Sequence, residues 1–359
     1  MHTFKKYPST NQFSGAVKHV RDHCKYHNLP LPTLKVSGSV KLHGTNAAIG
    51  FNENDVWFQS RENLITYEKD NAGFATWGTQ NLDILKEIYS IIVSENNLEH
   101  DAFYIFGEWF GGNIQQGVAL SQLNVKKFGI FKMIFVKFKT KIVKKLIDGV
   151  DIEEEVNADE TYEIDPCNFH SRINTMLPNV VVIDYIVPPV EVTIDFENPH
   201  LVQNQLLELV LGVEKECPVG KYFGFSGIGE GLVFSCNEVD WFPRFKCKGE
   251  LHSASKVKTV RELTSAEIAS KANSVEFVEY ACTENRLKQG IDKLVEMGLT
   301  VDIKSMGAYL KWVGQDILKE EMDVLIESKI ERGDVMPAIA NKARNWFLNY
   351  LNSELGLAA

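Results

Sequence analysis

A lysine and a histidine two residues apart could together act on a phosphate group. Lys41 and His43 belong to the sequence K-L-H-G-T-N at residues 41–46, which ends a predicted strand and turns sharply at the glycine. Side chains two residues apart on a strand point to the same face, so the amine and the imidazole would lie beside the backbone amides of the turn. This pair alone is weak evidence, because a lysine at a strand end is more often a solvated charge.

Two further segments place a carboxylate beside glycines, one at the end of a predicted strand and one at the start of another. Glu108 follows an apolar run in F-G-E-W-F-G-G at residues 106–112, and Glu230 precedes one in G-E-G-L-V-F at residues 229–234. Carboxylate oxygens are preferred ligands of hard divalent cations such as Mg²⁺. An acid beside a glycine is usually just part of a turn, so these glutamates gain weight only together with the other segments.

A fourth segment supplies fixed cations. In R-F-K-C-K at residues 244–248, Lys246 and Lys248 share one face of a predicted strand with Arg244. These side chains could hold a triphosphate, although alternating lysines also protect edge strands against aggregation. Phosphate chemistry needs a nucleophile, carboxylates for metal ions and fixed cations, and all of them occur in one β-rich part of this chain.

The elements that would position these residues are mostly strands. We expect a helix over residues 81–95, where apolar residues recur at helical spacing, and a solvated insertion or hairpin over the acidic residues 147–163. Asn52–Asp55 suits a hairpin turn. The predicted strands are residues 36–40, 47–51, 56–60, 102–109, 128–138, 180–186, 231–235 and 243–248.

The strand pattern ends near residue 262. Thr264–Glu267 is a capping-box sequence, and residues 286–297 have one apolar face followed by Gly298, where a helix commonly ends. Pro337 suits the first position of a last amphipathic helix. We therefore predict two domains, residues 1–261 and an all-helical domain at residues 262–359.

Composition excludes several classes of protein. The chain has 359 residues, of which 44% are hydrophobic and 24% charged, as in soluble globular proteins. The formal net charge of -10 argues against a protein that coats nucleic acid, but a local basic site remains open. The longest apolar run, residues 128–138, is interrupted by lysines and is shorter than the ~20 residues of a membrane span. We expect a soluble, cytoplasmic protein without a signal peptide.

The order of the motifs resembles the covalent nucleotidyltransferase superfamily of polynucleotide ligases and mRNA capping enzymes. K-x-H-G-T-N, F-G-E-x-x-G, E-G-L-V-F and K-x-K follow one another, and the histidine of the first motif is similar to the phage RNA ligase 2 family. Residues 281–286 and 313–321 also resemble the helical C-terminal domain of that family. The resemblance implies an α+β fold, in which a nucleotidyltransferase domain of antiparallel β-sheets and flanking helices precedes a small all-helical domain.

The resemblance also implies an activity. It is that of an ATP-dependent RNA ligase, which joins a 3′-hydroxyl to a 5′-phosphate through a lysyl-AMP intermediate and an AMP-capped RNA 5′ end. ATP would be the AMP donor, Mg²⁺ or Mn²⁺ the metal, and a nicked RNA duplex the partner. By family analogy we expect a monomer that takes part in RNA repair and is encoded by a phage or virus.

Roles for individual residues follow from the same resemblance. Lys41 would be the nucleophile, with His43 as its companion. The other expected roles are nucleotide binding by Asn46, Arg61, Glu108 and Phe128, metal binding by Glu108 and Glu230, and catalysis and phosphate binding by Lys246 and Lys248. One motif departs from the family, because the residue after Phe131 is Lys132 instead of an acid.

Electrostatics explains why such a site needs several cations. A lysine amine of ordinary pKa, about 10.4, is charged at neutral pH and cannot attack phosphorus. Neighbouring cations lower that pKa by destabilising the ammonium.

Two alternatives remain open. A DNA ligase or capping-type enzyme would show a further β-rich domain after K-x-K, where this sequence looks helical. A non-catalytic protein that binds RNA ends would not need the lysine, the two carboxylates and K-x-K together.

Overall fold

The computed structural model describes most of the chain, which divides into two compact units that we treat separately. The first unit comprises Met1–Tyr7 and Leu42–Pro188, and the second comprises Pro8–Lys41 and Pro189–Ala359. The described residues are 2–112, 114–147, 150–249, 251, 274–327 and 330–354.

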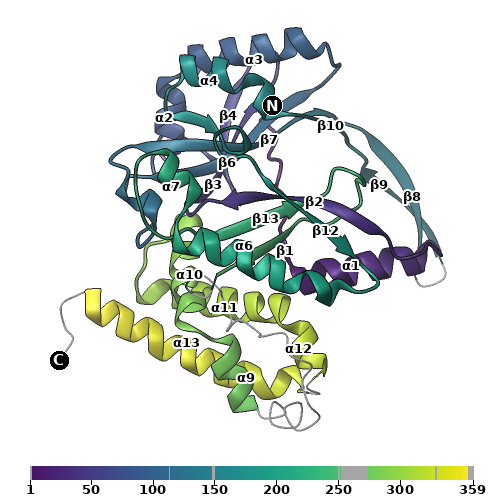
Figure 1. Ribbon diagram of the computed structural model, residues 1–359, viewed down its shortest axis with the longest axis vertical. Helices are drawn as coiled ribbons and strands as arrows, with labels where there is room; N and C mark the ends of the chain where they lie inside the picture. The colour runs from purple at the N-terminus through teal and green to yellow at the C-terminus, as the bar shows by residue number, and fades with distance from the viewer. Residues whose placement is uncertain are drawn as a thin grey trace. The chain divides into compact units, whose positions relative to one another are not determined.

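A seven-stranded sheet forms the centre of the first unit (Figure 1). Its strands follow the order β10-β7-β6-β3-β4-β5, all antiparallel, and β11 pairs in parallel with β7. A separate antiparallel ribbon is made of β8 and β9. The strands are β3 (Thr45–Phe51), β4 (Val56–Ser60), β5 (Leu64–Ile65), β6 (Ala102–Gly111), β7 (Lys126–Lys137), β8 (Thr140–Ile147), β9 (Val150–Asn157), β10 (Glu160–Ile164) and β11 (Val180–Val182).

Helices cover one face of this sheet and enclose the main apolar core (Figure 1). The largest, α3 (Leu82–Asn96), buries Leu85, Ile88 and Ile92, as the predicted helical spacing requires. The predicted strand 180–186 is only partly correct, because it continues after β11 as a helical turn. The other helices are α2 (Phe74–Gln80), α4 (His170–Met176) and α5 (Ile183–Ile186), with 3-10 turns at Ala119–Gln122 and Pro166–Phe169.

The opposite face of the same sheet carries a smaller apolar cluster that includes Trp57, Tyr104 and Phe106. The N-terminal segment lies against this cluster, since the Tyr104 hydroxyl donates a 2.9 Å hydrogen bond to the carbonyl of Thr3. The ring of Tyr7 also packs against that of Phe106, with centroids 5.1 Å apart.

A five-stranded sheet, ordered β1-β14-β13-β2-β12, lies at the centre of the second unit. Buried and more exposed residues alternate along β2, which leaves Lys41 on the face opposite Val36 and Val40. The elements are β1 (Asn11–Gln12), α1 (Phe13–Tyr26), β2 (Thr33–Lys41), β12 (Val190–Asp195), a 3-10 turn at Pro199–Val202, α6 (Gln203–Lys215), α7 (Pro218–Tyr222), β13 (Gly231–Ser235) and β14 (Phe245–Lys248).

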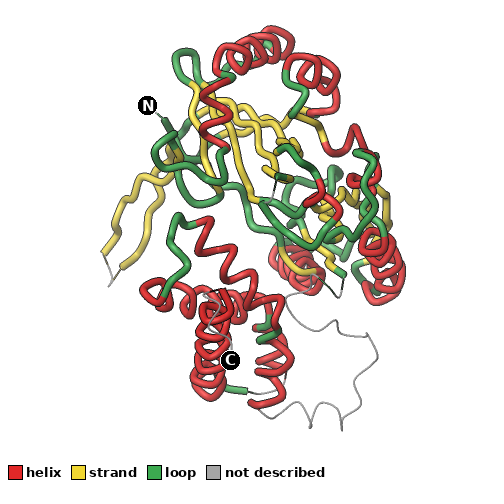
Figure 2. The backbone as a smooth tube through the Cα atoms, turned by 90° about the vertical axis from the view of Figure 1, so that its left-hand side faces the viewer, coloured by secondary structure: helices red, strands yellow, loops and turns green. Residues whose placement is uncertain are grey.

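The described part of the chain after residue 273 is helical, as predicted (Figure 2). It has its own apolar core, which includes Leu294, Tyr309 and Val313. The elements are α9 (Ser274–Ala281), α10 (Glu284–Glu296), a 3-10 turn at Ile303–Ser305, α11 (Met306–Glu320), α12 (Met322–Glu327) and α13 (Arg332–Glu354).

Some predictions for this region hold and one is wrong. Gly298 follows α10 with a φ of +71°, as its predicted helix-ending role requires. The side chain of Thr283, which was not predicted as a cap, caps the start of this helix. The predicted capping box at Thr264–Glu267 lies outside the described residues. Pro337 does not begin a helix, because α13 already begins at Arg332. The proposed domain boundary at 261/262 lies outside the described residues and stays a prediction.

The predicted α+β fold class, with antiparallel-rich sheets, flanking helices and a helical C-terminal region, is confirmed. Among the described helices, none combines the length and hydrophobicity that crossing a membrane requires.

Candidate active site

The second unit brings Lys41, Glu230 and Lys248 into direct contact. β13 runs between β2 and β14, so Lys41 and Lys248 are both register partners of Gly231, one on each side. Glu230 directly precedes this glycine. Its Oε2 lies 2.6 Å from the Lys41 Nζ and its Oε1 lies 2.7 Å from the Lys248 Nζ. One carboxylate therefore bridges lysines from the two flanking strands.

Glycine at position 231 makes this arrangement possible. Its φ of +143° lies in a region that residues with a side chain rarely adopt. A Cβ at this position would also lie 2.1 Å from the carbonyl oxygen of Cys247. Glu230 and Gly231 thus have separate roles: the glycine permits close strand pairing at the point where the glutamate contacts both lysines.

The three charged groups are largely removed from solvent. The Glu230 side chain is 4% exposed, and those of Lys248 and Lys41 are 12% and 24% exposed. Burial lowers the pKa of Lys248, Glu230 opposes that shift, and the charges of Lys41 and Lys246 add to it. Lys248 therefore lies where burial and two neighbouring lysines destabilise its charged form.

Lys246 contacts a different carboxylate, which the motifs did not predict. Its Nζ lies 3.2 Å from the Oε1 of Glu320, the last residue of α11. The other oxygen of Glu320 accepts a hydrogen bond from the side-chain amide of Gln12, the register partner of Lys246 on β1. Burial acts to raise the pKa of Glu320, but the charge of Lys246 and the hydrogen bond from Gln12 outweigh it and lower the pKa.

A fully buried arginine holds the end of α11. The Arg286 guanidinium contacts Asp316 Oδ2 and Glu321 Oε1, each at 3.0 Å. The Tyr280 hydroxyl donates to the second oxygen of Glu321 at 3.0 Å. Burial raises the pKa of Asp316, and the charge of Arg286 opposes this shift. The acids at residues 316, 320 and 321 were a visible signal for this cluster, whereas the burial of Arg286 was not.

In the first unit, strand register aligns three other predicted residues. Asn46 on β3 lies directly opposite Glu108 on β6, so their side chains share a face of the sheet. Ala47 pairs with Ser60, which places Arg61, just past the end of β4, at the level of Asn46. Arg61, Asn46 and Glu108 thus form one row across three neighbouring strands, and each is partly exposed.

His43 lies in the tight turn that leads into β3. A Cβ on the following Gly44 would be 2.4 Å from the carbonyl oxygen of Trp109, so only glycine lets this turn approach β6 so closely. His43 is partly exposed, and its role in catalysis stays a prediction.

Phe128 is not part of this row. It is the register partner of Trp109, and the alternation along β6 turns that residue to the face opposite Glu108. Its side chain is 0% exposed and packs among core rings, with a centroid 5.0 Å from that of Phe74. The ring has no exposed side on which a base could stack in this structure. Adenine stacking by Phe128 stays a prediction that would require its neighbours to move.

The predicted metal ligands, Glu108 and Glu230, are carboxylates from two different segments of the chain. Within the described residues, no group of three or more His, Cys, Asp or Glu side chains is arranged to hold a metal ion. Mg²⁺ commonly binds through one or two carboxylates together with substrate phosphates and water. The buried Glu230 carboxylate, in contact with Lys41 and Lys248, fits that mode, in which a nucleotide supplies most of the ligands.

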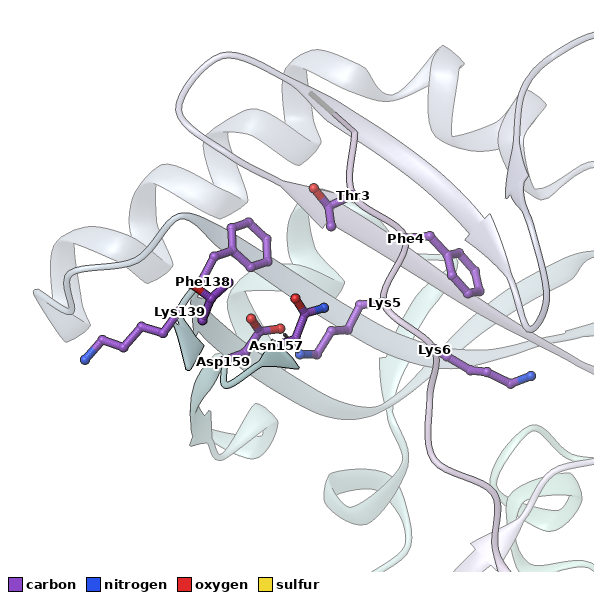
Figure 3. A pocket seen from close by; sticks show the side chains of 9 residues that line it. Thr3, Phe4, Lys5, Lys6, Phe138, Lys139, Asn157 and Asp159 are labelled. Carbon is purple, nitrogen blue, oxygen red and sulfur yellow. Dashed lines mark hydrogen bonds and ion pairs between the residues drawn. The ribbon is translucent and has the colours of Figure 1, made fainter. Parts of the chain in front are cut away.

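A groove of about 570 Å³ opens elsewhere in the first unit, between the N-terminal segment and the base of the β8–β9 ribbon (Figure 3). Lys5 crosses it to pair with Asp159 at 2.9 Å. Its lining includes none of the predicted site residues, so cavity size does not locate the chemistry here.

The sequence profile described as RNA ligase matches residues 34–248, which is more than half of the chain and spans every predicted site residue. The chain therefore belongs to the RNA ligase family.

Solved structures with a similar fold include Naegleria gruberi RNA ligase with PPi, at 14% identity and a TM-score of 0.40. Two variants of that ligase, one with AMP and Mn and one with ATP and Mn, match at 13% and 14% identity, both with a TM-score of 0.41. Each match covers 70% of this chain and 58% of the other, so the chain spans less than two thirds of the length of these structures. The comparison with curated proteins finds no match.

Proposed function

We propose that this member of the RNA ligase family is an ATP-dependent enzyme of the RNA ligase 2 type. It joins RNA 3′-hydroxyl and 5′-phosphate ends and forms a phosphoric ester bond. The observation that carries the proposal is the contact of Glu230 with both Lys41 and Lys248, inside the segment that matches the family.

In the proposed first step, the Lys41 amine attacks the α-phosphorus of ATP. A phosphorus–nitrogen bond forms, the bond to the β-phosphate oxygen breaks, and pyrophosphate leaves. Lys41 must lose its proton beforehand, and the nearby charges of Lys248 and Lys246 favour that loss. The contact with Glu230 has the opposite effect, because a carboxylate stabilises the ammonium.

This balance gives Glu230 a second role. A divalent ion, Mg²⁺ or Mn²⁺, would supply positive charge at this carboxylate and at the phosphates. With a divalent ion bound, the negative charge of Glu230 would be offset by the ion and would no longer stabilise the Lys41 ammonium. Lys248 and Lys246 remain as fixed donors that hold phosphate oxygens during the transfer.

The later steps move AMP to an RNA 5′-phosphate, and then a 3′-hydroxyl attacks that phosphate and releases AMP. We propose that His43 assists this cycle, and that Asn46, Arg61 and Glu108 bind the nucleotide, with Glu108 also able to hold the metal. The proposed substrate is a nicked RNA duplex, and we expect the enzyme to act as a monomer in RNA repair.

The direct test is a label transfer. The purified protein is incubated with α-labelled ATP and Mg²⁺, and then with 5′-phosphorylated RNA as a nicked duplex or single strand and with a nicked DNA duplex. We expect a labelled protein, followed by sealing of the nicked RNA. Sealing of DNA alone would favour the DNA ligase alternative. Absence of any labelled protein with ATP or GTP would contradict the proposal and favour a protein that only binds RNA ends.

A further inference from the structure

The side chains of Gln12 and Lys246 together bind the carboxylate of Glu320. They are register partners on the neighbouring parallel strands β1 and β14, and each donates to a different oxygen of the Glu320 carboxylate. Two donors from rigid strands on two oxygens of one group is an arrangement that suits carboxylate and phosphate oxygens alike. Gln12 lies outside the motifs, and its position was unpredictable without the pairing of β1 and β14.

The Glu320 carboxylate and the Lys246 amine are both largely shielded from solvent. The Glu320 side chain is 5% exposed and that of Lys246 is 19% exposed. A largely buried ammonium that loses its carboxylate partner is left uncompensated, which is costly. Whatever displaces Glu320 must therefore bring negative charge of its own.

The position of Gln12 and Lys246 indicates which anion would displace Glu320. Lys246 lies two residues before Lys248 on the same face of β14, about 7 Å further along the sheet. Lys248 and Lys41 lie on either side of Gly231, at the level where the nucleophile would attack. A triphosphate whose α-phosphate lies at Lys41 would direct its remaining phosphates toward such a neighbouring cation.

We infer that Gln12 and Lys246 form an oxyanion site for the pyrophosphate portion of the nucleotide, and that the Glu320 carboxylate competes with it. The site itself follows from the contacts, while the identity of its ligand rests on the proposed function. Arg286 fixes Asp316 and Glu321 on either side of Glu320 in the sequence. Pyrophosphate therefore enters only when Glu320, at the end of α11, breaks its contacts with Gln12 on β1 and Lys246 on β14.

The competition can be measured without catalysis. Inorganic pyrophosphate is titrated into the full-length protein in a calorimeter, with no ATP and no divalent metal. Glu320→Gln removes the competing charge and should tighten pyrophosphate binding about tenfold, equal to about 1.4 kcal/mol. Gln12→Ala should weaken it severalfold in the Glu320→Gln background, where no carboxylate masks the loss. Lys221→Ala removes an exposed lysine of the same unit that pairs with Glu216, and should leave binding unchanged.

A second variant keeps the test decisive if Glu320→Gln does not fold. Glu320→Asp keeps the charge but withdraws it by one methylene from Gln12 and Lys246, so it should also tighten binding. Affinity no higher than wild type in the folded variants, or no effect of Gln12→Ala, overturns the inference. A protein that forms the AMP adduct but fails these tests loses only this inference. One that passes them without forming an adduct loses the proposed ligase activity and retains the oxyanion site.

Discussion

In the second unit, the predicted lysines end in contact with buried carboxylates, whereas in the first unit Asn46 and Glu108 are aligned by the register of β3 and β6. The lysine cluster depends on close side-chain charges, and those of Lys41 and Lys246 help to lower the pKa of Lys248. The row of the first unit depends on backbone pairing over an apolar core. Removing one charge should therefore disturb the whole lysine cluster, while a change in the row should act locally.

The largest effect is expected at the nucleophile. Lys41→Ala should abolish the labelled protein–AMP adduct, because no neighbouring amine of the cluster can take the same place at the strand end. Label transfer from ATP in the presence of Mg²⁺ measures this, with Lys221→Ala as the control that should label normally. A Lys41→Ala protein that still becomes labelled would remove Lys41 from this role.

Replacing Lys248 and replacing Lys246 should slow adenylation to different degrees. Lys248→Ala should slow adenylation by about 10²–10³-fold, as loss of a preorganised donor to developing charge does. Lys246→Ala should have a smaller effect, because Glu320 already offsets its charge and it lies further from Gly231. Rates measured between pH 6 and 9 test this order. Equal rates for either variant and the wild type would count against that lysine.

Backbone geometry beside Glu230 should show in stability. Gly231→Ala forces an alanine into a φ of +143° and against the Cys247 carbonyl, so it should cost about 1–3 kcal/mol or more of unfolding free energy. Gly212→Ala is the control, since its Cβ within α6 would meet nothing within 4 Å. That variant should gain about 0.5–1 kcal/mol. Urea unfolding measures both, and equal stabilities would contradict the prediction.

The row in the first unit should respond more weakly. Arg61→Ala should slow adenylation about tenfold through loss of one charge-assisted contact to the nucleotide. Its ion pair with Glu62, at 4.0 Å, is partly exposed. The unfolding free energy should therefore change by less than about 0.5 kcal/mol. A large loss of stability would show that Arg61 supports the fold instead of the nucleotide.

The smallest effect concerns His170 in the first unit. Burial lowers its pKa, and its Nδ1 accepts a 3.1 Å hydrogen bond from the Val182 N–H. Below pH 6.5 the unfolded chain takes up this proton before the folded protein does, so acid favours unfolding. As the pH is lowered through this range, the unfolding free energy should decrease, and more steeply for the wild type than for His170→Gln. Identical slopes would show that His170 does not contribute.

Much of the β-rich region was predictable because its signals are local. The alternation along β2 fixed the side on which Lys41 emerges, and the E-G-L-V-F and K-x-K segments marked β13 and β14. Strand β4 and the helix over residues 82–96 were also visible from periodicity. Such patterns repeat every two or three to four residues, so a short window of sequence contains them.

Pro337 shows where a local signal misleads. Proline favours the first turn of a helix, but α13 begins five residues earlier, and Val335 and Ile339 on either side of the proline are buried in the helical core. Burial of the apolar side decided where this helix begins, against the preference of a single residue.

The sequence by itself determined the residue types, the strand periodicity and the order of the motifs. Tertiary structure alone decided that Glu230 meets a lysine 189 positions earlier, that Gln12 meets Lys246 through β1, and that Phe128 faces the core. The physical reason is that strand pairing and burial are collective: each contact joins residues far apart in the chain and forms only when whole sheets assemble, which no local pattern encodes.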